Sequence, residues 1–525
     1  MKTKSMVVAG LLAAAAPAMA QDIYKVESVG GTELNGTARF VGMGGAMSAL
    51  GADLSVMGSN PAGIGLYRSS DVALSASALV DPSATDFADR GKARASFDQI
   101  GFVYSAKVNG PELKFVNFGF NYHKSRNFKN YIGVDNFLTG GLSQSLEMLD
   151  LAYVGDGWLD LNTDDGRALT TPFTCLGYDT QMLAPEYDAD GNLTGYTPST
   201  AETYNYKRAQ WGGVQQYDFN VAFNVKDRFY GGLTFGLYNV NMHTFADYAE
   251  MLPDNDGYLH EYYMQYAEQL KGNGFDVKLG VIVRPFANSP FRLGLSFTTP
   301  TWYSLTADAS IFMHSPYVSQ HADYTEAQAD VAGNNYNVRT PWKLNVSAAT
   351  TVGSFLAIGA EYELSNYRKS NISYGGYYDD YYGYADGETD YALRGEIKRF
   401  MKPVHTLRVG VEGRLGKGTY LRAGYNHVTA PFEKDAYLNL FTASTSYFYQ
   451  PNTDYVNLGA TNRYTAGLGW RGKHFYFDAA YQFQGQKGDL YAFHVPEDGS
   501  EANRLSAAEV NLKRHQILFT LGYKF

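Results

Sequence analysis

Apolar or aromatic side chains alternate with small or polar ones in segments of about ten residues, and these segments recur to the C-terminus. The clearest example is the segment 215–225. Its apolar face is formed by Tyr217, Phe219, Val221, Phe223 and Val225, and its other face by Asp218, Asn220, Ala222 and Asn224. A period of two is that of a β-strand whose two faces meet different surroundings. The chain is therefore expected to be built from strands.

The same pattern predicts fourteen strands, an even number, and short turns between them alternate with long polar loops. This arrangement is typical of an all-β, 14-stranded antiparallel transmembrane β-barrel with both termini on the short-turn, periplasmic side. The predicted strands are residues 71–80, 98–107, 112–123, 215–225, 228–239, 273–286, 290–302, 335–350, 354–366, 404–414, 418–427, 461–471, 473–483 and 511–525.

A soluble β-sandwich also alternates, because one face of each sheet packs on a core. Charged residues on the predicted inward faces argue against it, since a dry core holds charges only at a cost of several kcal/mol each. These residues are Lys343, Glu361, Glu363, Arg408, Glu412, Arg422 and Asp478. Aromatic residues near strand ends fit interfacial girdles instead, namely Trp302, Tyr303, Trp342, Tyr420 and Trp470.

The N-terminus resembles a secretory signal peptide. Lys2 and Lys4 precede an apolar run, and Ala18-Met19-Ala20 predicts cleavage after Ala20. The run is shorter than the ~20 residues that a membrane-spanning helix needs. A barrel exported in this way belongs in the outer membrane of a Gram-negative bacterium, in contact with its lipid and lipopolysaccharide. The single cysteine, Cys175, gives no disulfide framework, and the net charge of −10 argues against nucleic acid as a partner.

The last strand, residues 511–525, alternates through Tyr523 to the terminal Phe525. It resembles the C-terminal signature by which the barrel-assembly machinery recognises outer-membrane proteins. We expect this machinery to be a partner during biogenesis, and the folded protein to be a monomer.

Residues 21–70 do not alternate, and they are rich in glycine and apolar residues. A barrel of this size is too wide for its own side chains to fill. The segment is therefore predicted to be a hatch folded inside the lumen, which divides the chain into a signal peptide (1–20), a hatch (21–70) and the barrel (71–525).

Within this segment, the stretches Gly42-Met43-Gly44-Gly45, Ala52-Asp53 and above all Asn60-Pro61-Ala62-Gly63 resemble the hatch of the FadL/TodX family. Members of that family transport long-chain fatty acids and aromatic hydrocarbons across the outer membrane. The resemblance implies passive diffusion of a hydrophobic small molecule from the extracellular loops to an apolar site above the hatch. It also implies a sideways exit where the third strand is kinked. The long loop 124–214 matches nothing in the family that identifies a substrate.

Two sets of site residues follow from this resemblance. Gly119 in the third strand is the predicted kink, although an ordinary inward glycine is an equal alternative. Five apolar hatch residues are candidates for the ligand site, with simple packing as the alternative: Phe40, Met43, Met47, Leu50 and Met57.

Other functions remain open. The Tyr-rich loop 374–391 suits a haem or other nutrient receptor, and an open barrel would be a non-specific porin. No arrangement of Ser, His and Asp predicts an enzyme. Residues 188–192 have only part of a calcium-loop pattern, and a hairpin turn is the simpler interpretation, so neither metal nor cofactor is predicted.

Overall fold

The computed structural model describes residues 22–85, 87–89, 91–254, 256–316, 325–374, 377–379, 383–385, 388–440, 452–497 and 500–525. The predicted signal peptide and its cleavage after Ala20 lie outside these residues and stay predictions. Among the described residues, no helix is both long enough and apolar enough to span a membrane.

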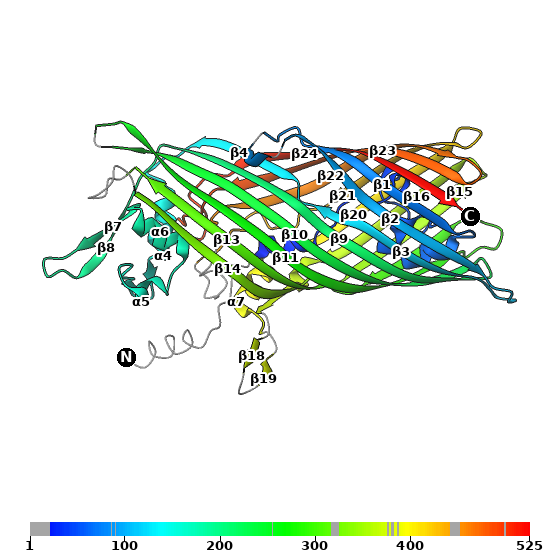
Figure 1. The fold of residues 1–525 in the computed structure, drawn as a ribbon, viewed down its shortest axis with the longest axis horizontal. Coiled ribbons are helices and arrows are strands. Elements are labelled where there is room, and N and C mark those ends of the chain that lie inside the picture. The colour runs from blue at the N-terminus through cyan, green and yellow to red at the C-terminus, as the bar shows by residue number, and fades with distance from the viewer. Residues whose placement is uncertain are drawn as a thin grey trace.

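The strands form one closed antiparallel barrel (Figure 1), because β1 (Asp71–Val80) pairs with both the second and the last wall strand. Fourteen wall strands make up the barrel. The remaining wall elements are β2 (Ala93–Lys107), β3 (Leu113–Asn127), β4 (Asn130–Phe137), β9 (Thr203–Val225), β10 (Phe229–Pro253), β11 (Leu259–Val283), β12 (Arg292–Thr298), β13 (Trp302–Ser315), β14 (Thr325–Arg339), β15 (Lys343–Val352), β16 (Leu356–Asn366), β17 (Asn371–Tyr374), β20 (Pro403–Arg414), β21 (Thr419–Val428), β22 (Tyr455–Arg471), β23 (Phe475–Tyr491) and β24 (Ala508–Lys524).

Four wall strands are interrupted, so that β3 and β4, β12 and β13, β14 and β15, and β16 and β17 each form one strand of the wall. Two of the interruptions contain Pro300 and Pro341, which have no N–H to donate to the ladder. The predicted segments 290–302 and 335–350 each crossed one of these interruptions.

The two faces of the wall are as the alternation predicts. On β9, Tyr217, Phe219 and Val221 are 37–49% exposed, whereas the intervening Asp218 and Asn220 are 0–3% exposed. The exposed face forms an apolar band around the barrel, and Trp302 and Trp470 lie on its surface. The prediction that Tyr303 belongs to the aromatic girdle on the outer surface was wrong, because this residue faces inward and packs edge-on against Tyr238.

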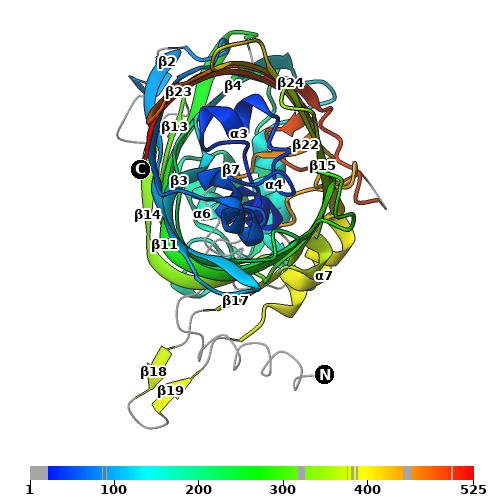
Figure 2. The ribbon, with the colours of Figure 1, turned by 90° about the vertical axis from the view of Figure 1, so that its right-hand side faces the viewer.

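Between Asp22 and β1 the structure has four short helices, and Figure 2 shows them inside the ring of strands. They are α2 (Ile23–Gly30), α3 (Ala38–Gly42) and the 3-10 helices η1 (Leu54–Gly58) and η2 (Pro61–Leu66). Helix α3 packs against β21 to β24 on one side of the lumen, and η2 packs against β9 to β11 on the other. The segment thus crosses the barrel from wall to wall.

Beyond the apolar band, long polar strand extensions and the loops between them fill the mouth of the barrel. The loop 124–214 folds into β4, α4 (Gln144–Leu151), β5 (Tyr153–Val154), β6 (Gly157–Trp158), α5 (Asp164–Arg167), α6 (Pro172–Asp179), β7 (Leu183–Tyr187) and β8 (Leu193–Pro198) before β9 begins. Residues 188–192 form the turn between β7 and β8.

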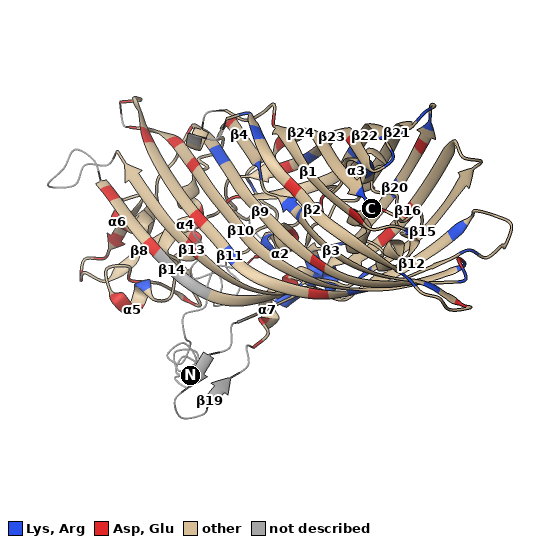
Figure 3. Cartoon of the chain, turned by 45° about the vertical axis from the view of Figure 1, so that its right-hand side comes forward, with Lys and Arg blue, Asp and Glu red and all other residues tan. Residues whose placement is uncertain are grey.

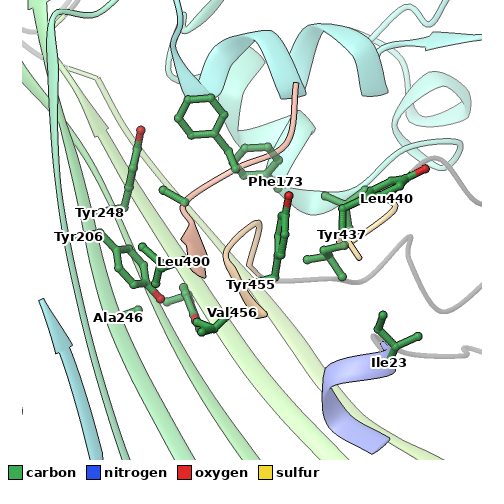
Figure 4. Packing of buried hydrophobic residues seen from close by; sticks show 14 of the residues in the cluster. Ile23, Phe173, Tyr206, Ala246, Tyr248, Tyr437, Leu440, Tyr455, Val456 and Leu490 are labelled. Atoms are coloured by element: carbon green, nitrogen blue, oxygen red, sulfur yellow. The ribbon is translucent and has the colours of Figure 1, made fainter. Parts of the chain in front are cut away.

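Other loop elements are η3 (Phe87–Asp89), η4 (Tyr367–Lys369), β18 (Tyr377–Asp379), β19 (Gly383–Ala385) and α7 (Tyr391–Phe400). One large cluster of buried apolar residues joins α2, α4, α6 and α7 to the inner face of the extended strands. Figure 4 shows part of it, with Ile23 of α2 below Phe173 and Tyr455. The mouth is therefore packed rather than open.

Candidate functional site: the hatch, the lumen above it and an opening in the wall

Inward-facing glycines of the wall make room for the backbone of the hatch. A Cβ on Gly410 would lie 2.2 Å from the carbonyl oxygen of Met43, and one on Gly424 would lie 2.2 Å from the amide of Gly44. On the opposite side, a Cβ on Gly232 would lie 2.4 Å from the backbone of Pro61. The stretches 42–46 and 60–62 therefore touch the wall at backbone distance, which explains why small residues recur on both surfaces.

A buried ion network binds the hatch to β20, β21 and β23. Arg39 donates two hydrogen bonds of 2.9 Å to the carboxylate of Glu412. Arg422 bridges Glu412, at 2.6 Å, and Asp478, at 2.7 Å. These inward charges, predicted from the sequence, are satisfied by one another and by the hatch, because a lone charge at this depth costs several kcal/mol.

The stretch Asn60-Pro61-Ala62-Gly63 begins η2. The Asn60 side chain caps this helix by accepting a hydrogen bond from the amide of Ala62. From the wall, Asn117 donates to the carbonyl oxygen of Ile64 at 2.7 Å, and Ser296 donates to that of Ser59 at 2.6 Å. The motif thus forms a turn within the hatch, and the residues beside it are hydrogen-bonded to the barrel wall.

The five predicted apolar ligand residues occupy different surroundings. Met43, Met47, Leu50 and Met57 are buried in the hatch core, together with Val56 and Ile64. Phe40 belongs to the same buried cluster and also lines a cavity beside the hatch. Contact of these five residues with a ligand stays a prediction.

A cavity that encloses about 1220 Å³ of empty space, part of it open to solvent, lies above the hatch, and we call it the upper cavity. Its lining is mostly polar and charged, which corrects the expectation of an apolar site. Most of its charges are paired across the lumen: Lys25 with Glu268, Arg126 with Glu27, Arg208 with Asp454, and Arg514 with Glu33. The first, second and fourth pairs each join the N-terminal part of the hatch to the wall.

A second cavity, of about 880 Å³, lies beside the hatch and shares Glu33 with the first as a lining residue. Its wall, continued by Gln484 and Arg514 of the first cavity, carries a ladder of alternating guanidinium and amide side chains in register across five strands. The rungs are Arg408, Asn426, Arg463, Gln484 and Arg514.

Arg408 pairs with Glu361 and Glu363, and Arg514 pairs with Glu33. Arg463, only 5% exposed, donates to the amide oxygens of Asn426 and Gln484 and makes no ion pair with any described carboxylate. It is the rung whose charge a bound anion would balance.

The wall is not fully paired above the apolar band. β2 pairs with β3 only from Gln99 and His123 downward, and its residues 93–97 pair with β1 alone. Among the described residues, β4 pairs only with β9, and the stretch 508–514 of β24 pairs only with β23. β4 and β24 therefore lie side by side, in contact but without a backbone hydrogen-bond ladder, above the end of the β1–β2 hairpin, and we call this unpaired seam the wall opening.

The upper cavity reaches this opening. Lys129, Asn130 and Tyr131 line it on one side, and Leu512, Lys513 and Arg514 line it on the other. Arg514 is buried and faces the lumen, whereas Lys513 is exposed on the outer surface, so residues of both faces of the wall line the cavity here. On the outside, Lys129 donates hydrogen bonds to the carbonyl oxygens of Gly91 and Lys92, and Phe87 packs against Tyr131.

Gly119 does not mark this opening. It pairs in register with Val103 on one side and Asn220 on the other, and a Cβ there would meet Met57 of the hatch at 2.4 Å. The register of β3 shifts elsewhere, between Leu113 and Phe115 and between Lys124 and Arg126. Gly119 is an inward glycine beside the hatch, and the third strand breaks after Asn127 instead.

The C-terminal strand closes the barrel. The amide and carbonyl of Phe525 exchange hydrogen bonds with those of Ser70, each 3.1 Å long, and the exposed ring of Phe525 stacks on Tyr523. Recognition of this end by the assembly machinery stays a prediction. The haem hypothesis concerns the loop 374–391, and the side chains of residues 374–387 lie outside the described part of the chain.

No protein-family model and no curated protein matches the sequence. Solved structures do match in fold. A FadL homologue from Pseudomonas aeruginosa covers 94% of this chain and 99% of its own, at 12% identity and a TM-score of 0.51. The toluene transporter TbuX from Ralstonia pickettii (13% identity, 94% and 99% coverage, TM-score 0.47) and the toluene transporter TodX from P. putida (12%, 94% and 99%, 0.43) are also similar. The chain thus has the fold of the FadL-type outer-membrane transporters, a 14-stranded barrel with its N-terminal segment inside the lumen.

Proposed function

We propose that this protein carries hydrophobic small molecules with a polar or acidic head across the outer membrane of a Gram-negative bacterium, by passive diffusion through the wall opening between β4 and β24. The observation that carries the proposal is the upper cavity, which is lined by lumen-facing and outward-facing residues at that opening. The hatch blocks the straight path below it.

The position of the opening supports a sideways path. β1 ends at Val80, opposite His515, and the exposed apolar residues Ile517, Phe519 and Leu521 follow directly below. A solute leaving the cavity there meets the upper edge of the apolar band. It can therefore enter the hydrocarbon layer without crossing the sugar layer of the lipopolysaccharide.

The lining of the second cavity, which adjoins the upper cavity at Glu33, supports a solute with an acidic head. A plain hydrocarbon gains nothing from the guanidinium ladder, whereas a carboxylate would balance Arg463 in a place that water reaches poorly. The similar structures include transporters of toluene, and the polar lining distinguishes this chain from a path suited only to such apolar solutes.

The test places tryptophan in the opening. We expect Asn130→Trp to fill the cavity between the two strands, and to lower the uptake rate of a radiolabelled long-chain fatty acid roughly tenfold, as expected for a rise of about 1.4 kcal/mol in barrier height. Asn136→Trp, on the same strand but outside the cavity lining, should leave uptake unchanged. Equal uptake by both variants, each shown to be folded by heat-modifiable gel migration, contradicts a path through this opening.

A further inference from the structure

The short turns and the chain end at the end of the barrel that carries the C-terminus (Figure 3) are strongly basic. Residues 67–70, 107–114, 226–228, 284–291, 353–355, 414–418, 471–474 and 524–525 contain eleven Lys or Arg and only two acidic residues, Glu112 and Asp227. The chain as a whole has the opposite balance, with 53 acidic and 43 basic residues. We call these eleven residues the basic ring.

The opposite end of the molecule is acidic. Residues 138–202, in the mouth, contain eleven Asp or Glu and one Arg. Basic residues are therefore concentrated at one end of the barrel and acidic residues at the other. The overall composition, which is acidic, does not explain the basic end.

Only four residues of the basic ring form ion pairs with described acidic residues, although Arg228, Arg284 and Arg414 also donate hydrogen bonds to backbone carbonyl oxygens of the turns. Lys226 pairs with Glu112, Arg68 with Asp227, and Arg471 and Lys524 turn towards Asp478 and Asp71. The other seven make no ion pair with a described acidic residue: Lys107, Lys114, Arg228, Arg284, Arg414, Lys417 and Lys473. Charges of one sign within a ring repel one another, so a counter-charge from outside the chain is expected.

The ring directly borders the apolar band. Phe229, Phe355 and Phe475 are exposed large aromatic residues in or beside these turns, and Trp470 precedes Arg471. Aromatic rings at this position lie at the level of lipid head groups. The cations next to them therefore lie at the depth of the lipid phosphates.

We infer that the basic ring binds anionic phospholipids, of the phosphatidylglycerol type, in the leaflet that faces the periplasm. The inference rests on the short turns facing the periplasm and is independent of the transported solute. The distribution of the cations favours lipid over an acidic protein, because lipids surround a barrel on all sides, and the cations occupy seven of the eight segments at this end. A docked protein would need them on one side only.

The experiment compares two quadruple Lys→Gln variants of equal charge change. The ring variant replaces Lys107, Lys114, Lys417 and Lys473, and the control variant replaces the exposed Lys271, Lys369, Lys398 and Lys434 outside the ring. Each protein, in detergent, is given equal amounts of phosphatidylglycerol and phosphatidylcholine with identical acyl chains. The lipids that stay bound are counted by native mass spectrometry.

We expect the wild type and the control variant to retain more phosphatidylglycerol than phosphatidylcholine. In the ring variant the ratio of the two bound lipids should fall at least about fivefold, which is the effect of one cation near an anionic lipid surface. An equal preference in the ring and control variants overturns the inference, and so does no preference in the wild type. If the ring variant does not fold, the inference is tested on the wild type alone. Its preference for phosphatidylglycerol should fall at high salt, because salt screens exposed charges. A preference that salt leaves unchanged would also overturn the inference.

Discussion

At the residue scale, the hatch backbone can touch the wall because the glycines at the contact have no Cβ atom. Gly410 faces the lumen in β20, and the Met43 carbonyl oxygen occupies the space of its missing Cβ. Gly413, in the same strand, has no atom within 4 Å of its Cβ position. The two glycines lie on opposite faces of the strand, and only the inward-facing Gly410 meets the hatch.

We therefore expect Gly410→Ala to displace the hatch from the wall, at a cost of about 1–3 kcal/mol, typical of an overpacked interior. In planar bilayers the variant should show ionic current that the wild type lacks. Gly413→Ala is the matched control and should behave like the wild type. A closed Gly410→Ala barrel with an unchanged melting temperature would show that the hatch does not rest on this glycine.

At the element scale, the sequence predicted well the strand segments that have one face towards lipid and the other towards the lumen. The predicted strand 71–80 has the bounds of β1, and the predicted 404–414 differs from β20 by one residue. β10 was predicted to end at 239 and continues to Pro253. In the extension the inward residues become apolar, as at Val240 and Met242, whereas outward residues such as Asn241 are polar. The pattern of an apolar outer face and a polar inner face therefore stops where the strand leaves the membrane.

The site was harder to predict than the strands, for a related reason. The hatch could be predicted from Gly42 to Gly45 and from Asn60-Pro61-Ala62-Gly63, because each of these stretches is continuous in the sequence. The wall opening arises because β1 and β2 end at Val80 and Ala93, below the level that β4 and β24 reach, and β4 and β24 are nearly 400 residues apart in the chain. The guanidinium ladder likewise needs the register of five strands. One signal was available: Arg408, Arg463 and Arg514 each interrupt the inward face of a predicted or extended strand.

Helix α4 offers a test of how the mouth is packed. Glu147 on this helix is fully buried, and neither of its carboxyl oxygens has a hydrogen bond of good geometry. Burial raises the pKa of Glu147 well above its ordinary value, the backbone amide of His494 offsets part of the rise, and the charges of Asp150 and Asp454 add to it.

The folded mouth therefore holds the Glu147 proton more tightly than the unfolded chain does. This contribution to stability is complete below the ordinary pKa of glutamate and is lost as pH rises towards the raised folded pKa. We expect Glu147→Gln to raise the melting temperature at pH 7.5 and to change it little at pH 4. The exposed Glu202→Gln is the control for the loss of charge. A mutant that is less stable than the wild type at pH 7.5 would mean that the ionised carboxylate has a partner in the mouth.

At the scale of the whole molecule, the barrel combines a hatch that closes the lumen with an opening that leads sideways. The hatch is held by backbone contact with wall glycines, by the Arg39–Glu412 pair and by ion pairs of its N-terminal part. A non-specific porin needs an open lumen, and these contacts leave none at the level of the hatch. Transport and closure to ions are therefore expected together.

The most direct measurement records both properties on one membrane whose outer leaflet is lipopolysaccharide. Fatty-acid uptake and ionic conductance are measured with the wild type and with a variant lacking residues 22–65. We predict that the wild type speeds uptake over the protein-free membrane while conducting almost no ions, and that the deletion opens a steady conductance. A wild type that conducts ions as freely as the deletion variant, or that takes up the fatty acid no faster than the bare membrane, would contradict the account.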